Sequence, residues 1–149
     1  MQRGDSATRR GEFVEIDHTA DLGLDLLGAT PDAVLEAALR GLVHVLFGGD
    51  PPGIEPREER RVVIAAGSWA ELLKAWLEGL YRLLEDERFV PSGVRFERVE
   101  PTGLEAVVTG ACPPREAIAE ASELKAVTYH QLSFAREGEL WRARVIFDV

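Results

Sequence analysis

Residues 13–26 read FVEIDHTADLGLDL, and apolar residues alternate with polar or small ones on both sides of a short polar interruption. Successive side chains of a strand point to opposite faces, so this pattern predicts strands that are buried on one face only. We therefore expect one strand over Phe13–Asp17 and another over Leu22–Leu26, with the HTAD sequence at residues 18–21 forming the corner between them.

Two amphipathic helices are predicted after this pair of strands. Thr30 and Pro31 suit the start of the first, because Thr caps free N–H groups and Pro loses no hydrogen bond at the first helical position. Gly48 suits its end. Ser68 and Glu71 form a capping box that predicts the start of the second helix, each accepting the other's backbone N–H. The apolar residues at helical spacing are Val34, Leu35, Ala38, Leu39, Leu42, Val45 and Leu46, then Leu72, Leu73, Trp76, Leu77, Leu80 and Leu84.

The remaining short alternating segments predict strands, one before the second helix and the others after it. Early helices followed by clustered strands predict an α+β fold, a single domain with a largely antiparallel sheet and the order ββαβα followed by several strands. We expect residues 1–12 to be a disordered tail and residues 13–149 to form the domain. The predicted strands are Arg61–Ala65, Val94–Val99, Leu104–Thr109, Leu124–Tyr129, Gln131–Ala135 and Leu140–Phe147.

Composition narrows the class of protein. With 149 residues, 46% of them hydrophobic, the chain is long enough for one core without disulfides, and its single cysteine, Cys112, has no internal partner. The polar start of the chain lacks the apolar region of a signal peptide, and no apolar run approaches the ~20 residues of a membrane span. We therefore expect a cytoplasmic protein that does not enter membranes.

Charge narrows the choice of partner. The net charge of -9 repels phosphate backbones, so direct nucleic-acid binding is not expected. The same charge suits a hard cation or a basic protein surface. No nucleotide-binding glycine loop, nucleophile elbow, zinc-protease motif or calcium-binding EF-hand loop is present in the sequence.

Candidate ligand residues gather at the HTAD corner and at the end of the chain. Asp17, His18 and Asp21 crowd one turn, and oxygen-rich turns bind Ca²⁺ or Mg²⁺, although such residues also commonly bond the turn's own backbone. Asp148 precedes only Val149 and its terminal carboxylate. If the last strand lies beside Asp21, these oxygens surround one cation; a frayed terminus is the alternative.

Lys125 shares one predicted strand face with Val127 and Tyr129. A lysine on such a face either extends its ammonium to the rim or pairs with a carboxylate. A third reading is protection of a sheet edge, since lysine discourages aberrant strand pairing. The sequence leaves these readings open.

Three segments give the chain a resemblance to a known family. They are F-x-E-x-x-HTAD-x-G at 13–23, LKAVTYH at 124–130 and W-x-ARVIFDV at 141–149. In these segments and their order, the chain resembles the archease family from Phe13 to Val149. The resemblance implies a non-enzymatic activator of an RtcB-type RNA ligase in tRNA splicing and RNA repair, which promotes GTP-dependent guanylylation and multiple turnover. GTP and RNA are then bound by the ligase.

The resemblance also implies roles for particular residues. Asp21, Asp148 and a backbone oxygen of Val149 would bind a divalent metal, Ca²⁺ in the first instance with Mg²⁺ or Mn²⁺ as alternatives. Lys125 would act with Asp21 and Asp148 in activating the ligase. His18 and Asp17 would lie just outside the metal ligands.

One departure from the family is the glycine at position 79, where many members have an acidic residue, and Glu78 is a candidate to compensate. Two other functions stay open. One is a metal-dependent phosphoester hydrolase acting alone at the Asp-rich corner. The other is a general acidic chaperone or scaffold.

Overall fold

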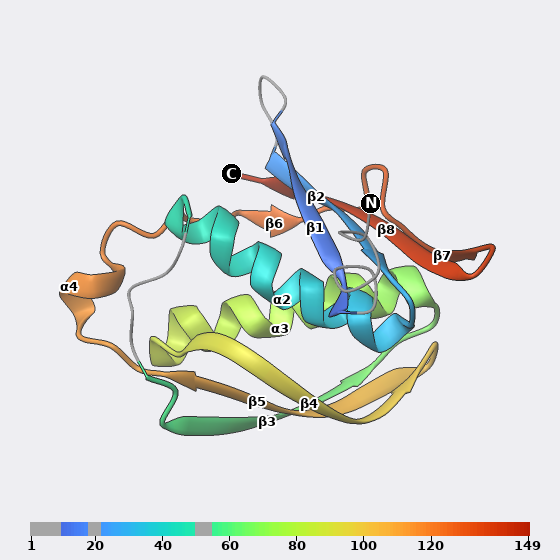
Figure 1. Cartoon of the computed structure of the whole chain (residues 1–149). Helices are drawn as coiled ribbons and strands as arrows, with labels where there is room; N and C mark the ends of the chain where they lie inside the picture. Colours follow the sequence, from blue (N-terminus) through green and yellow to red (C-terminus); the bar gives the residue numbers. More distant parts are fainter. Residues whose placement is uncertain (1–9, 18–21, 50–54) are drawn as a thin grey trace, which may run out of the picture.

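Two helices lie between two antiparallel sheets, so the molecule has three layers (Figure 1). The computed structural model describes residues 10–17, 22–49 and 55–149. Helix α2 contacts β1, β2 and β8 of one sheet and β4 of the other, while α3 contacts β6 and β7 on one side and β3 and β4 on the other. The α+β class, the ββαβα order and the antiparallel pairing are confirmed.

The larger sheet carries both ends of the domain. Its strand order is β1-β2-β8-β6, and β7 also pairs with β8, beyond β6 along the same edge. Leu22 stands opposite Phe147, and Ala126 stands opposite Asp148. The five strands are β1 (Glu12–Asp17), β2 (Leu22–Gly28), β6 (Ala126–Val127), β7 (Ser133–Glu137) and β8 (Leu140–Asp148).

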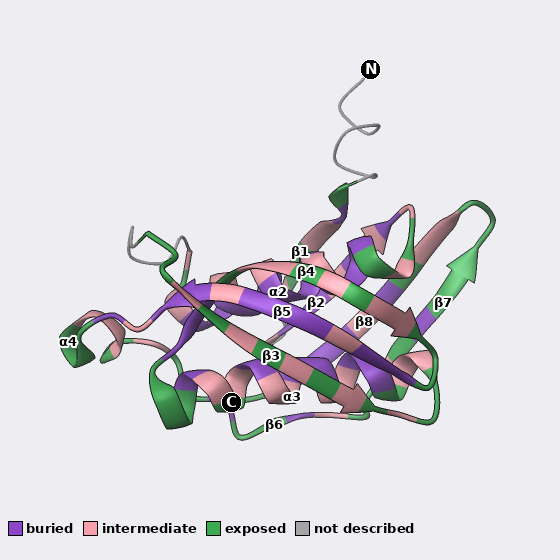
Figure 2. Ribbon diagram, turned by 90° about the horizontal axis from the view of Figure 1, so that it is seen from below, coloured by how far each residue is buried: buried purple, intermediate pink, exposed green. Residues whose placement is uncertain are grey.

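The smaller sheet has the order β3-β5-β4 and covers the other side of the helices. Figure 2 shows that exposed and less exposed residues alternate along β3, while the central strand β5 is mostly buried. Ion pairs cross the outer face, where Arg61 approaches Glu97 at 2.7 Å and Arg98 approaches Glu105 at 3.0 Å. Its strands are β3 (Glu58–Ala65), β4 (Val90–Glu100) and β5 (Gly103–Ala111).

Helix α2 (Pro31–Phe47) has the ends that its sequence predicts. The Thr30 hydroxyl accepts a hydrogen bond from the Ala33 N–H at 3.1 Å. At the other end Gly48 adopts a left-handed φ of 67°, a conformation that glycine enters without a steric penalty. The predicted stripe is buried, as expected for a helix between two sheets.

Helix α3 (Trp69–Glu87) begins with a modified form of the predicted capping box. The Ser68 hydroxyl accepts the Glu71 N–H at 3.2 Å, as predicted. The Glu71 carboxylate, however, accepts the N–H of Gly67 at 2.9 Å rather than that of Ser68. The bond thus reaches one residue further back than the capping box predicts.

The core joins the two helices to both sheets. Trp76 is fully buried and donates its indole N–H to the Leu35 carbonyl at 2.9 Å, which fixes α3 against α2. None of the described helices is long and apolar enough to cross a membrane. A short helix, α4 (Arg115–Ile118), was not predicted; it has no buried residue and no side-chain cap.

Several predicted boundaries need correction, since β3 begins at Glu58 rather than Arg61 and β4 begins at Val90 rather than Val94. Strand β1 begins at Glu12, and Gly11 is packed under α2, where an added Cβ would meet the Ala33 carbonyl oxygen at 2.2 Å. Residues 1–9 of the predicted tail lie outside the described part of the chain. The strand predicted over 124–129 is reduced to the two residues of β6.

Candidate functional site

Lys125 and Asp148 are neighbours although 23 positions separate their numbers in the sequence. The backbone N–H of Lys125 donates to the carbonyl oxygen of Asp148 at 2.8 Å. Both residues are exposed, and Val149 beyond them is 41% exposed. Lys125, Asp148 and Val149 therefore lie together at one end of the larger sheet.

The strand on the other side of β8 begins at the same end. Leu22 is the first described residue of β2, and it lies opposite both Asp17 and Phe147. Asp21 immediately precedes Leu22 in the sequence, but Asp21 and His18 lie outside the described residues. The backbone of Asp17 ends β1, so it reaches this end of the sheet two strands away from β8.

Among residues 10–17, 22–49 and 55–149, no ion pair joins Lys125 to a carboxylate. The exposed side chain and the position of β6 at the edge of the sheet fit the rim and edge-protection readings of this lysine. Lys125 and Asp148 are thus exposed charges that form no ion pair with each other.

Helix α3 holds the segment that carries Lys125. The hydroxyl oxygen of Tyr81 accepts the N–H of Leu124 at 2.9 Å, and partial burial raises the pKa of this phenol. Further along, the ammonium of Lys74 lies 4.7 Å from the centre of the Tyr129 ring. These contacts were not predicted, because they join positions far apart in the chain.

Strand β8 supports the same segment from its other side. The N–H and the hydroxyl of Thr128 both donate to the Ile146 carbonyl oxygen, at 3.0 and 2.9 Å. Residues 124–128 are therefore bonded to α3 at one end and to β8 along their length. The site is built on a supported backbone rather than on an isolated chain end.

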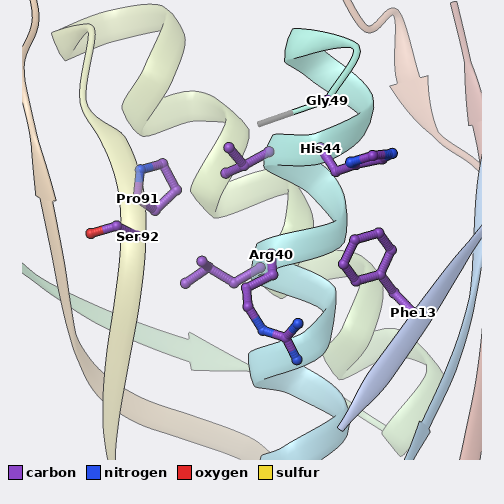
Figure 3. A pocket seen from close by; sticks show the side chains of 8 residues that line it. Phe13, Arg40, His44, Gly49, Pro91 and Ser92 are labelled. Atoms are coloured by element: carbon purple, nitrogen blue, oxygen red, sulfur yellow. The ribbon is translucent and has the colours of Figure 1, made fainter. Parts of the chain in front are cut away.

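A hollow of about 260 Å³ lies elsewhere on the surface, over α2 between β1 and β4 (Figure 3). The Arg40 guanidinium on its wall is already bonded to Glu36 at 2.8 Å and to the Gly11 carbonyl at 2.8 Å. His44 packs against the Phe13 ring with centroids 5.3 Å apart. None of the predicted site residues that the structure describes lines this hollow, and the Arg40 guanidinium is engaged in holding Gly11 to α2.

The described part of the chain holds no cluster of three potential metal ligands from His, Cys, Asp or Glu side chains. The described donors at the end of β8 are the Asp148 carboxylate and the backbone oxygen of Val149. They are hard oxygen donors, which suit Ca²⁺ or Mg²⁺ rather than a soft transition metal. They make an incomplete set, so a cation there needs a further ligand.

Comparison with known proteins gives the site its context. The sequence profile of the Archease protein family matches residues 13–149. The chain belongs to the Archease protein family. It is similar to the protein archease of Thermococcus gammatolerans, with 34% identity over 147 residues that cover 95% of this chain and 99% of the relative. The protein archease of Methanosarcina acetivorans is 30% identical over 142 residues, covering 93% and 96%.

Solved structures agree with the fold. The solution structure of Methanobacterium thermoautotrophicum protein 1598 matches with a TM-score of 0.73 and 31% identity, covering 94% of this chain and 99% of that one. The crystal structure of a Thermotoga maritima archease, described as a possible chaperone, matches with a TM-score of 0.59 and 25% identity, covering 90% and 94%. The three-layer arrangement is thus shared with archease structures.

Gly79 lies in the middle of α3. An added Cβ at Gly79 would meet only the Ile64 Cδ1 atom, at 3.8 Å, which is ordinary contact. The neighbouring Glu78 pairs with Lys74 at 2.8 Å. Its carboxylate is therefore part of the contact that supports Tyr129, which gives this acidic residue a role within the chain.

Proposed function

We propose that this protein is an accessory protein of an RtcB-type RNA ligase, which it activates by promoting GTP-dependent guanylylation and multiple turnover. Its membership of the Archease family supports this proposal. The observation that carries it is the bond between the Lys125 N–H and the Asp148 carbonyl, which brings two exposed charged residues together beside Val149.

The role proposed for each residue follows from the chemistry of its side chain or backbone. Asp21, Asp148 and Val149 would hold a divalent cation, Ca²⁺ in the first instance, with His18 and Asp17 close to the ligands. Asp21 is a reasonable third donor because it precedes Leu22, whose partner Phe147 precedes Asp148. Such a cation supplies positive charge for phosphate oxygens. Lys125 would place its ammonium in the ligase's active site, where fixed charge favours phosphoryl transfer.

The acidic character of the chain supports a protein partner over RNA. A net charge of -9 favours approach to a basic surface, such as that of an RNA-binding enzyme, and this attraction weakens as salt rises. The accessory protein would then leave RNA binding and GTP chemistry to the ligase.

The proposal is tested by following guanylylation of the cognate ligase with labelled GTP, with and without substoichiometric amounts of this protein. Acceleration over repeated turnovers is expected. Lys125→Ala and Asp148→Asn should abolish at least nine-tenths of the acceleration, which is roughly a tenfold effect or about 1.4 kcal/mol. Arg57→Ala and Asp86→Asn remove exposed charges elsewhere and should leave it intact. No acceleration by the wild-type protein would overturn the proposal.

A general chaperone is the second candidate, because the related Thermotoga maritima protein is described as a possible chaperone. Under this alternative, Lys125→Ala and Asp148→Asn would matter little, whereas reversing several acidic surface charges would matter greatly. Protection of an unrelated aggregating enzyme by the wild-type protein, together with full activity of both site variants, would favour the chaperone. Turnover of a phosphoester by the protein alone would instead favour a hydrolase.

A further inference from the structure

A tight turn directly after the Lys125 segment presents Tyr129 and His130 to solvent. The Thr128 hydroxyl accepts the His130 N–H at 3.2 Å while donating to the Ile146 carbonyl at 2.9 Å. The Leu132 N–H donates to the Tyr129 carbonyl at 3.2 Å and closes the turn. The backbone of the turn is therefore bonded both internally and to β8.

The turn also contains a strained residue that its surroundings hold in place. Gln131 has a φ of 54°, in the left-handed region that residues other than glycine rarely enter. Its side-chain oxygen accepts a hydrogen bond from Arg144 at 3.0 Å, and the same guanidinium is bonded to Asp25 at 2.7 and 2.9 Å. Such strain persists only where several contacts over-determine the conformation. The turn is therefore a fixed feature of the surface.

The side chain that this turn displays is an exposed aromatic ring. Tyr129 is 69% exposed, one of four large apolar side chains exposed in the described part of the chain, and Val149 is another. The Lys74 ammonium, itself paired with Glu78 at 2.8 Å, lies over the ring at 4.7 Å. The ring is thus oriented by a cation without being buried. Tyrosines held in this way lose little conformational freedom on binding and are common anchors of interfaces.

We propose that Tyr129, presented by this turn and steadied by Lys74, is the anchor by which the protein docks on the ligase, separate from the role of Lys125 and Asp148 in the chemistry. This inference rests on the proposed function. Tyr129 follows Lys125 by four residues, which span at most about 13 Å of extended chain. That distance fits within one ordinary interface of about 800 Å² per partner. The ligase would offer an apolar slot for the ring of Tyr129.

The test is a titration of the protein into the ligase, in which guanylylation rate is measured against concentration. Tyr129→Ala should raise the half-saturating concentration roughly 10- to 30-fold and leave the rate at saturation unchanged. Lys125→Ala should do the reverse, lowering the saturating rate while changing the half-saturating concentration little. Val63→Ala, which truncates another 63% exposed side chain on the outer face of the smaller sheet, is the matched control and should resemble the wild type.

Direct binding separates failure of the anchor from failure of the proposed function. Calorimetric titration of the ligase should show the same loss of affinity for Tyr129→Ala, with Tyr129→Phe retaining most of it. If Tyr129→Ala has the half-saturating concentration and the affinity of the wild type, or loses only rate at saturation, Tyr129 is not the docking anchor. Activation of the ligase would still stand. A wild-type protein that binds through Tyr129 without accelerating guanylylation would support the anchor and overturn the function. A melting temperature equal to that of the wild type verifies that the variant is folded.

Discussion

The phenol oxygen of Tyr81 accepts the backbone N–H of Leu124 at 2.9 Å and so joins α3 to the segment that leads into Lys125. Leu124 is 6% exposed, so its N–H has little access to water. Tyr81→Phe should leave this donor unsatisfied and lower the free energy of unfolding by about 1–2 kcal/mol. Urea denaturation measures the change, and hydrogen exchange should show faster exchange of the Leu124 amide.

The control for this substitution is Tyr129→Phe. Its hydroxyl makes no hydrogen bond within the described residues, so its removal should change the free energy of unfolding by less than about 0.5 kcal/mol. If both variants unfold at the same urea concentration as the wild type, the bond to Leu124 contributes nothing to stability.

Alkaline pH gives a second test of Tyr81. Burial, reinforced by the charges of Glu85 and Glu123, raises the pKa of this phenol above 10.0. The folded protein therefore retains the phenol proton more tightly than the unfolded chain does. The associated stability is fully present below pH 10 and is lost as pH rises through the folded pKa. The free energy of unfolding should fall more steeply above pH 10 in the wild type than in Tyr81→Phe; parallel curves would contradict the shift.

Replacing the glycine in the middle of α3 with alanine should stabilise the protein. Gly79→Ala adds a methyl group 3.8 Å from Ile64 Cδ1 and removes the entropic cost of a helical glycine, so the free energy of unfolding should rise by about 1 kcal/mol. Gly41→Ala is the matched control, because its Cβ would lie 2.8 Å from Leu24 Cδ1 and should destabilise the protein by about 1–3 kcal/mol. Thermal melts of the two variants should therefore shift in opposite directions, and shifts of the same sign would contradict this reading of α3.

The sequence predicted features whose causes are local. Thr30 and Ser68 cap their helices with bonds to residues three positions away, and Gly48 ends α2 through its own backbone conformation. The strand over 124–129 was over-predicted for a non-local reason. Two segments share the edge of β8 with which this strand could have paired. Strand β6 pairs with Phe147 and Asp148, while β7 pairs with residues 140–144. An alternating pattern in the sequence does not show which segment will pair with a given strand edge.

In the candidate site, too, the sequence named residues but did not predict their non-local contacts. The resemblance to archeases named Lys125 and Asp148, and in the structure a backbone hydrogen bond joins these two residues. The support from Tyr81 was missed because its partner is 43 residues away. A polar hydroxyl beside the apolar stripe of α3 was the available signal, but it did not identify the partner. Asp21 and His18 stay predictions.

Calcium should stabilise the wild-type protein if the proposed site exists. A ligand that binds only the folded state at 100 times its Kd adds about 2.7 kcal/mol to the free energy of unfolding. After treatment with a chelator, added Ca²⁺ should therefore raise the melting temperature of the wild type. Asp21→Ala and Asp148→Asn should lose this rise, because each removes a hard oxygen donor from the set. Loss in Asp21→Ala would also supply the evidence that Asp21 and Asp148 share one cation.

The matched control for the calcium titration is Asp86→Asn, which removes an exposed carboxylate near the end of α3 and should retain the whole rise. Mg²⁺ and Mn²⁺, titrated in the same way, rank the alternatives by the concentration at which each stabilises the protein. An undiminished rise in Asp148→Asn would place the cation elsewhere. Ligase activation by Lys125 would then have to proceed without a metal held beside Asp148, because a backbone oxygen of Val149 alone cannot bind a divalent ion.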